Sequence, residues 1–227
     1  MEETMSKAEF IQSSTASREE FEELLNRITH GLGLMLSVAG SVSLLDFAWR
    51  SGDAWRLVGC AVYALTLVGV YCFSTLSHSF SSPSAKRLFR VLDQGFIYLL
   101  IVGTYTPFAL AHLRNTWWWL FLGFVWACAL IGFISKVGFA HRVEAVSVWL
   151  YVALGWMLVI PARTLLELVS ASCVWWMLAG GVCYTAGTLF LLNDQRRPYY
   201  HAVWHTFVIA GSACQFFPIL FHVALPT

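Results

Sequence analysis

Apolar residues follow one another along this chain in long stretches, which are interrupted only briefly by charged residues, proline or glycine. A helix needs about 20 apolar residues to cross the hydrocarbon core of a bilayer, which is about 30 Å thick. Seven stretches meet this requirement, and the pattern therefore predicts an all-α, polytopic membrane protein with a bundle of seven transmembrane helices. The expected spans are approximately Ile28–Ala48, Trp55–Ser77, Val91–Leu113, Trp117–Ile134, Val143–Pro161, Cys173–Leu192 and Tyr200–Val223.

Composition supports the same class of protein. Of the 227 residues, 58% are apolar and 12% are charged, whereas soluble domains have about 45–50% and about 25%. The net charge of +1 gives no reason to expect a nucleic-acid partner. Residues 1–20 are polar and predict a disordered cytoplasmic tail. The short connections between the later stretches group residues 21–227 into one transmembrane domain.

Basic residues are distributed unevenly between the two sides of the predicted bundle. Ten lie on the side of the N-terminus and four on the other side, which accounts for all 14 Lys and Arg residues. By the positive-inside rule, the N-terminus is expected in the cytoplasm and the C-terminus outside. The four basic residues on the outer side are Arg50, Arg56, Arg114 and Arg163.

Histidines are concentrated in the cytoplasmic half of the predicted bundle, although ionisable groups inside a membrane are costly. His78 ends the second span, while His201 and His205 open the seventh. Because His201 and His205 are four residues apart, they project from the same face of their helix. Asp93 and Ser74 lie at a similar depth. Three helices are thus expected to bring three imidazoles, a carboxylate and a hydroxyl to one level.

Three neutral imidazoles with an open fourth position form the ligand set of a catalytic zinc site. Zn²⁺ lowers the pKa of a bound water to near 7, and Asp93 is suited to orient that water or to take its proton. Other interpretations stay open, because Asp93 could instead cap its helix and His30, in the first span, could hydrogen-bond another helix. The remaining histidines, His112, His141 and His222, lie away from this level.

Four motifs occur in this order along the chain: Glu22–Gly31, Ser74–His78, Asp93–Pro107 and His201–His205. In this order and on these spans they resemble the progestin and adipoQ receptor superfamily, specifically its bacterial hemolysin-III-like branch. The resemblance covers nearly the whole chain from Glu22 onward. One departure is Ser77, where many relatives have tyrosine.

The resemblance implies roles for particular residues. Zinc ligands are expected at His78, His201 and His205, the carboxylate that holds the water at Asp93, and a serine of the site at Ser74. The remaining matches belong to the first-helix signature, for which the resemblance implies no clear role; they are Glu23, Asn26 and His30.

The resemblance also implies an activity, because the family is similar to membrane-embedded metal hydrolases, including ceramidases, that act on lipid amides. The expected protein is a zinc-dependent lipid hydrolase of the bacterial inner (plasma) membrane, with a membrane lipid or acyl chain as substrate and a role in lipid homeostasis. Two alternatives stay open. The first is a non-enzymatic sensor or regulator of the membrane with a structural zinc ion, and the second is a pore-forming hemolysin.

Overall fold

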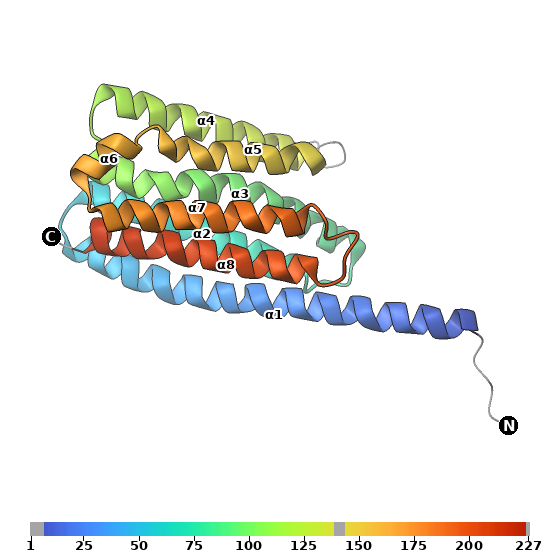
Figure 1. The fold of residues 1–227 in the computed structure, drawn as a ribbon. Coiled ribbons are helices and arrows are strands. Elements are labelled where there is room, and N and C mark those ends of the chain that lie inside the picture. Colours follow the sequence, from blue (N-terminus) through green and yellow to red (C-terminus); the bar gives the residue numbers. More distant parts are fainter. Residues whose placement is uncertain (1–6, 139–143, 226–227) are drawn as a thin grey trace.

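The computed structural model describes residues 7–138 and 144–225, with side chains from 15–138 and 148–225, and these segments contain helices but no strand (Figure 1). A short 3-10 helix, Met157–Val159, follows Trp156, and a π-helical turn, Leu220–Ala224, follows Ile219. The prediction of an all-α, polytopic bundle is confirmed. The main helices are α1 (Lys7–Arg50), α2 (Ala54–Ser77), α3 (Pro83–His112), α4 (Thr116–Gly138), α5 (Glu144–Trp156), α6 (Ala162–Leu168), α7 (Ala171–Leu191) and α8 (Tyr200–Ile219).

The described helices provide six crossings by length and composition, and a bent pair provides a seventh. The pair consists of residues 148–159 and 162–168, which meet at 46°. The sequence predicted one uninterrupted helix over Val143–Pro161. The helix breaks there because Pro161 has no backbone N–H and restricts the residue before it.

Helix α1 extends well beyond the predicted first span of residues 28–48. It begins at Lys7, so residues 7–20, which the sequence predicts as a disordered tail, form part of the helix. Each residue added to an existing helix gains a hydrogen bond without repeating the cost of nucleation, and the Glu residues at 19, 20, 22 and 23 favour helix. Residues 1–6 of the predicted tail lie outside the described residues.

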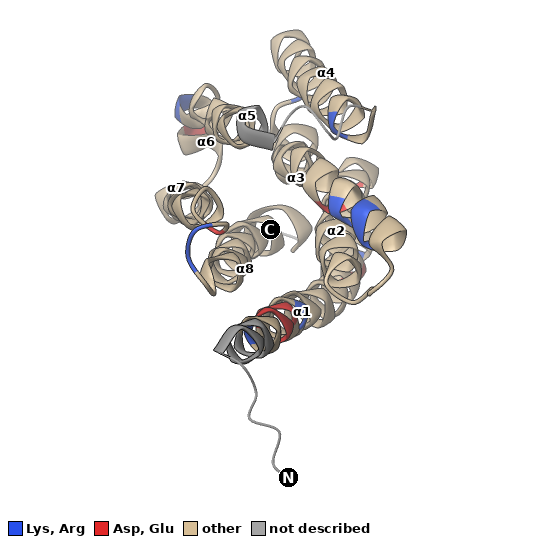
Figure 2. Ribbon diagram, turned by 90° about the vertical axis from the view of Figure 1, so that its right-hand side faces the viewer, with Lys and Arg blue, Asp and Glu red and all other residues tan. Residues whose placement is uncertain are grey.

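Six helices enclose the centre of the bundle in a ring, in the order α1, α2, α3, α5, α7 and α8, with α8 returning to α1 (Figure 2). Helix α4 packs outside this ring, against α3 and α5. The chain enters the bundle at one end and leaves it at the other (Figure 1), as an odd number of crossings requires. Outward-facing apolar side chains such as Met35, Val42 and Ile131 are exposed, which suits surroundings of lipid rather than water.

Small residues let the first three helices approach closely. The ring of Tyr71 on α2 fills the space beside Gly33 on α1, so a Cβ at position 33 would lie 2.4 Å from it. Similarly, a Cβ at Gly59 would lie 2.8 Å from the Cα of Pro107 on α3. This close packing holds α1 and α3 against α2, whose last residue precedes His78.

Candidate metal centre

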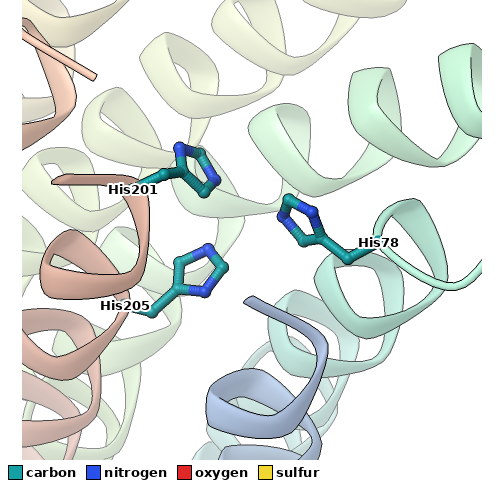
Figure 3. A group of neighbouring side chains, drawn as sticks. All are labelled: His78, His201 and His205. Atoms are coloured by element: carbon teal, nitrogen blue, oxygen red, sulfur yellow. The ribbon is translucent and has the colours of Figure 1, made fainter. Parts of the chain in front are cut away.

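The three histidines that the sequence singles out come together at one end of the bundle (Figure 3). One ring nitrogen from each of His78, His201 and His205 lies within 4.8 Å of the other two. His78 follows the last residue of α2 and caps that helix, while His201 and His205 occupy the first two turns of α8. The juxtaposition expected from spacing is therefore present.

Each of these three rings uses its Nδ1 atom for a hydrogen bond to a residue outside the cluster. Two of the acceptors are carboxylates and the third is a hydroxyl. The pairs are His78 Nδ1 with Glu23 Oε2 at 2.7 Å, His201 Nδ1 with Asp194 Oδ2 at 2.8 Å, and His205 Nδ1 with Thr29 Oγ1 at 3.1 Å.

These partners also decide which nitrogen carries the proton. A carboxylate accepts hydrogen bonds, so the Nδ1 atoms facing Glu23 and Asp194 are the donors. The Thr29 hydroxyl already donates to the carbonyl of Leu25 at 2.9 Å, so its oxygen accepts from His205 Nδ1. In the neutral form, all three imidazoles therefore present a lone pair at Nε2.

The residues present fit a metal ion. The Nε2 atom of His78 is buried and has no hydrogen-bond partner among the described residues. Leaving such an atom unsatisfied costs about 1–3 kcal/mol, and a cation bound at Nε2 removes that cost. Histidines that bind metals commonly donate their other N–H to a carboxylate, carbonyl or water, which is the arrangement of this cluster.

Asp93 and Ser74 lie beside the histidines, as expected, but outside the group of ligand atoms. The half-buried carboxyl of Asp93 interacts electrostatically with the His201 ring and neighbours the Ser74 hydroxyl. Ser74 is completely buried, and its Oγ atom lies beside the Asp93 carboxyl without a well-aligned hydrogen bond among the described residues. A carboxylate and a hydroxyl thus stand next to the imidazoles, and the carboxylate also interacts electrostatically with Arg90.

The first-helix residues contact the cluster from α1. Glu23 also accepts a hydrogen bond from Lys86 Nζ at 2.5 Å, so this carboxylate links α1 to the ends of α2 and α3. Asn26 and His30 are buried. The His30 ring stacks on that of His205, with a centroid separation of 3.5 Å and an interplanar angle of 22°.

Sequence reasoning missed three residues of this site: Asp194, Thr29 and Lys86. Asp194 lies in the connection between α7 and α8, seven residues before His201, where no helical spacing relates the two. Thr29 stands directly before His30 within a motif that the sequence did identify, but only the packing of α1 against α8 shows its partner. His112 lies elsewhere, and its Nε2 atom forms a hydrogen bond with the carbonyl of His222. His141 lies outside the described residues.

Comparison with known proteins places the chain in a family. The profile of a family described as haemolysin-III related matches residues 19–216. The chain belongs to the haemolysin-III related family. The matched segment contains the three clustered histidines and the hydrogen-bond partners of their Nδ1 atoms.

Individual relatives support this assignment. The chain is 41% identical over 206 residues to Hemolysin-3 of Bacillus cereus, covering 91% of this chain and 93% of that protein. It is 37% identical over 201 residues to a Hemolysin-3 homolog of Bacillus subtilis, with coverages of 88% and 94%. Human Monocyte to macrophage differentiation factor is 24% identical over 208 residues, with coverages of 88% and 83%, and supports the progestin and adipoQ receptor superfamily. No solved structure matches the chain.

Proposed function

We propose that the protein is a zinc-dependent hydrolase that cleaves an amide or ester bond of a membrane lipid and contributes to membrane lipid homeostasis. The observation that carries the proposal is the convergence of three imidazoles whose Nδ1 atoms are all bound elsewhere. His78, His201 and His205 would hold the ion through Nε2. Three imidazoles with an open fourth position suit a catalytic Zn²⁺ ion.

When bound, Zn²⁺ polarises a carbonyl oxygen and lowers the pKa of water to near 7. The Asp93 carboxylate takes a proton from the water that attacks the acyl carbon. As the bond from this carbon to nitrogen or oxygen breaks, Asp93 returns the proton to the leaving atom and becomes a carboxylate again. The Ser74 hydroxyl donates a hydrogen bond to the oxygen on which negative charge develops.

An apolar cavity inside the ring of helices supports a lipid substrate. It is lined in part by Val70, Ile97, Trp204 and Val208. Val70 lies one turn before Ser74 on α2, Ile97 one turn after Asp93 on α3, and Val208 one turn beyond the histidines of α8. On all three helices the cavity is therefore one turn deeper in the bundle than the site. An acyl chain in this space would place its carbonyl end at the histidines.

The two alternatives are less well supported. A structural zinc ion in a regulator would use a fourth protein ligand, whereas the ligand group found among the described residues has three members. The relatives' name, Hemolysin-3, suggests lysis, but an aqueous pore needs polar residues along its whole length. The interior between the helices instead contains large buried apolar side chains, including Leu44, Tyr63, Phe108, Met177 and Ile219.

The Asp93→Asn variant tests the proposal. In proteoliposomes containing fluorescent N-acyl amide and acyl ester lipids, we expect turnover to fall by about 10²–10⁴-fold while zinc content stays unchanged, because the amide cannot accept the proton. The Asp46→Asn variant, which removes a carboxylate paired with Arg50 far from the site, serves as the control. Full turnover by Asp93→Asn would refute the proposed mechanism.

A further inference from the structure

Two buried polar side chains of α1 carry atoms that have no hydrogen-bond partner among the described residues, although they lie directly beside the candidate metal centre. Asn26 is 6% exposed and His30 is 3% exposed. The Oδ1 atom of Asn26 and both ring nitrogens of His30 are unpaired among the described residues. The candidate mechanism uses neither residue, so these unpaired atoms need a separate explanation.

The positions of these two side chains are well defined. They are four residues apart on α1, so their Cβ atoms are about 5–6 Å apart on one face of the helix. The face of the His30 ring lies against His205, and the ring meets Tyr71 edge-on at a centroid distance of 5.2 Å. Helix α1 is itself tied to His205 through Thr29. The unpaired atoms are thus held in place next to one of the three clustered imidazoles.

The donor and acceptor chemistry of the pair specifies what would satisfy it. The Oδ1 atom of Asn26 only accepts hydrogen bonds, whereas a neutral His30 ring offers one N–H donor and one acceptor. A carboxylate or phosphate would leave Asn26 Oδ1 unpaired, and an ammonium group or metal ion would leave the N–H of His30 unpaired. An O–H group can donate to Asn26 Oδ1 and accept from the His30 N–H, so a single hydroxyl can bridge the two residues and leaves unpaired only the acceptor nitrogen of His30.

We infer that Asn26 and His30 form a buried subsite for a hydroxyl group, which lies beside the three-histidine cluster and belongs to a water molecule or to a lipid alcohol. This subsite gives two members of the first-helix signature a common role. Glu23 and Thr29 hold imidazoles of the cluster from the same helix, while Asn26 and His30 bind the hydroxyl. The subsite requires no ion at the cluster, so it stands apart from the proposed hydrolysis.

A double-mutant cycle on the purified full-length protein tests the inference. If a hydroxyl bridges the two side chains, Asn26→Leu and His30→Phe each break one bond and leave the other partner unpaired, so each lowers the melting temperature by about 2–4 °C. The double variant removes both polar groups, and we expect it to melt closer to wild type than either single variant. His30→Gln, which keeps a donor and an acceptor, should lose less than His30→Phe.

Matched controls separate this coupling from general effects of the substitutions. Ser41 lies farther along α1, and its Oγ atom is also buried and unpaired. The effects of Asn26→Leu and Ser41→Ala should therefore add. Each variant is measured with saturating Zn²⁺ and with a chelator, and its zinc content is determined separately. Coupling that persists in a protein without zinc would support the subsite even if the proposed hydrolase fails.

Two lipids distinguish the source of the hydroxyl. Coupling in delipidated protein identifies water. If coupling develops only with 1-monooleoylglycerol and not with methyl oleate, which has the same acyl chain but no hydroxyl, the ligand is a lipid alcohol. Effects that simply add in all these conditions, or single variants that melt at or above wild type, would overturn the inference. An experimental density map of the wild type that shows no atom between Asn26 Oδ1 and His30 would also overturn it, even if the variants fail to fold.

Discussion

Replacing Asp194 by Asn changes the support of one clustered histidine with little change in size. The Asp194 carboxylate accepts a hydrogen bond from His201 Nδ1 at 2.8 Å and is 14% exposed, so water screens this contact only weakly. The amide retains an oxygen acceptor but loses the negative charge. Hydrogen bonds that involve an ionised partner are roughly twice as strong as neutral ones, so the variant keeps a weaker contact rather than none.

The expected consequence is weaker metal binding by an otherwise intact protein. Loss of such an outer hydrogen bond typically lowers metal affinity by about 10–100-fold, which corresponds to about 1.4–2.8 kcal/mol of binding free energy. Competition between the detergent-solubilised protein and a fluorescent zinc chelator at pH 7 measures this change as a dissociation constant. Circular dichroism checks that the helices remain.

Asp46→Asn is the matched control, because it makes the same chemical change at an exposed site at the opposite end of α1. The Asp46 carboxylate forms an ion pair there with Arg50, at 2.9 Å. We expect the zinc affinity of this variant to equal that of the wild type. The reasoning is wrong if Asp194→Asn binds zinc as tightly as the wild type, or if both variants lose affinity equally.

Three further outcomes follow from the packing. Thr29→Val removes a neutral hydrogen bond and should weaken zinc binding less than Asp194→Asn in the same competition assay. Gly59→Ala places a Cβ 2.8 Å from the Pro107 backbone and should destabilise by about 1–3 kcal/mol, whereas Gly123→Ala, which meets no atom within 4 Å, should be neutral or stabilising in thermal unfolding. Ile97→Trp narrows the apolar cavity and should reduce hydrolysis of long-chain lipids more than short-chain ones, at unchanged zinc content; equal effects would argue against the cavity as the acyl-chain site.

Local features of the sequence account for much of the fold and for part of the site. The length of an apolar stretch directly reflects the thickness of a bilayer, so most spans agree with the helices observed. The spacing of His201 and His205 is a property of a single helix and could be predicted without knowing the rest of the structure. Placing His78 and Asp93 at the same level of the bundle required only the alternating direction of successive spans.

The remaining features depend on contacts between distant segments. Asp194 is held in a connection whose backbone path no periodic pattern predicts, and Tyr199 at its end has a left-handed φ of 65°. Glu23 approaches His78 because Gly33 allows α1 to pack closely against α2. The stacking of His30 on His205 likewise follows from helix packing. These contacts join parts of the chain far apart in sequence, which spacing alone cannot relate.

Metal analysis of the purified protein tests the central claim most directly, namely that the imidazole at the end of α2 and the two on α8 share one ion. We predict about one equivalent of zinc per chain in the wild type. Little or none should remain when His201 and His205 are both replaced by alanine, with helicity unchanged. Retention of a full equivalent by the double variant, or a wild type without zinc after purification in its presence, would contradict the account.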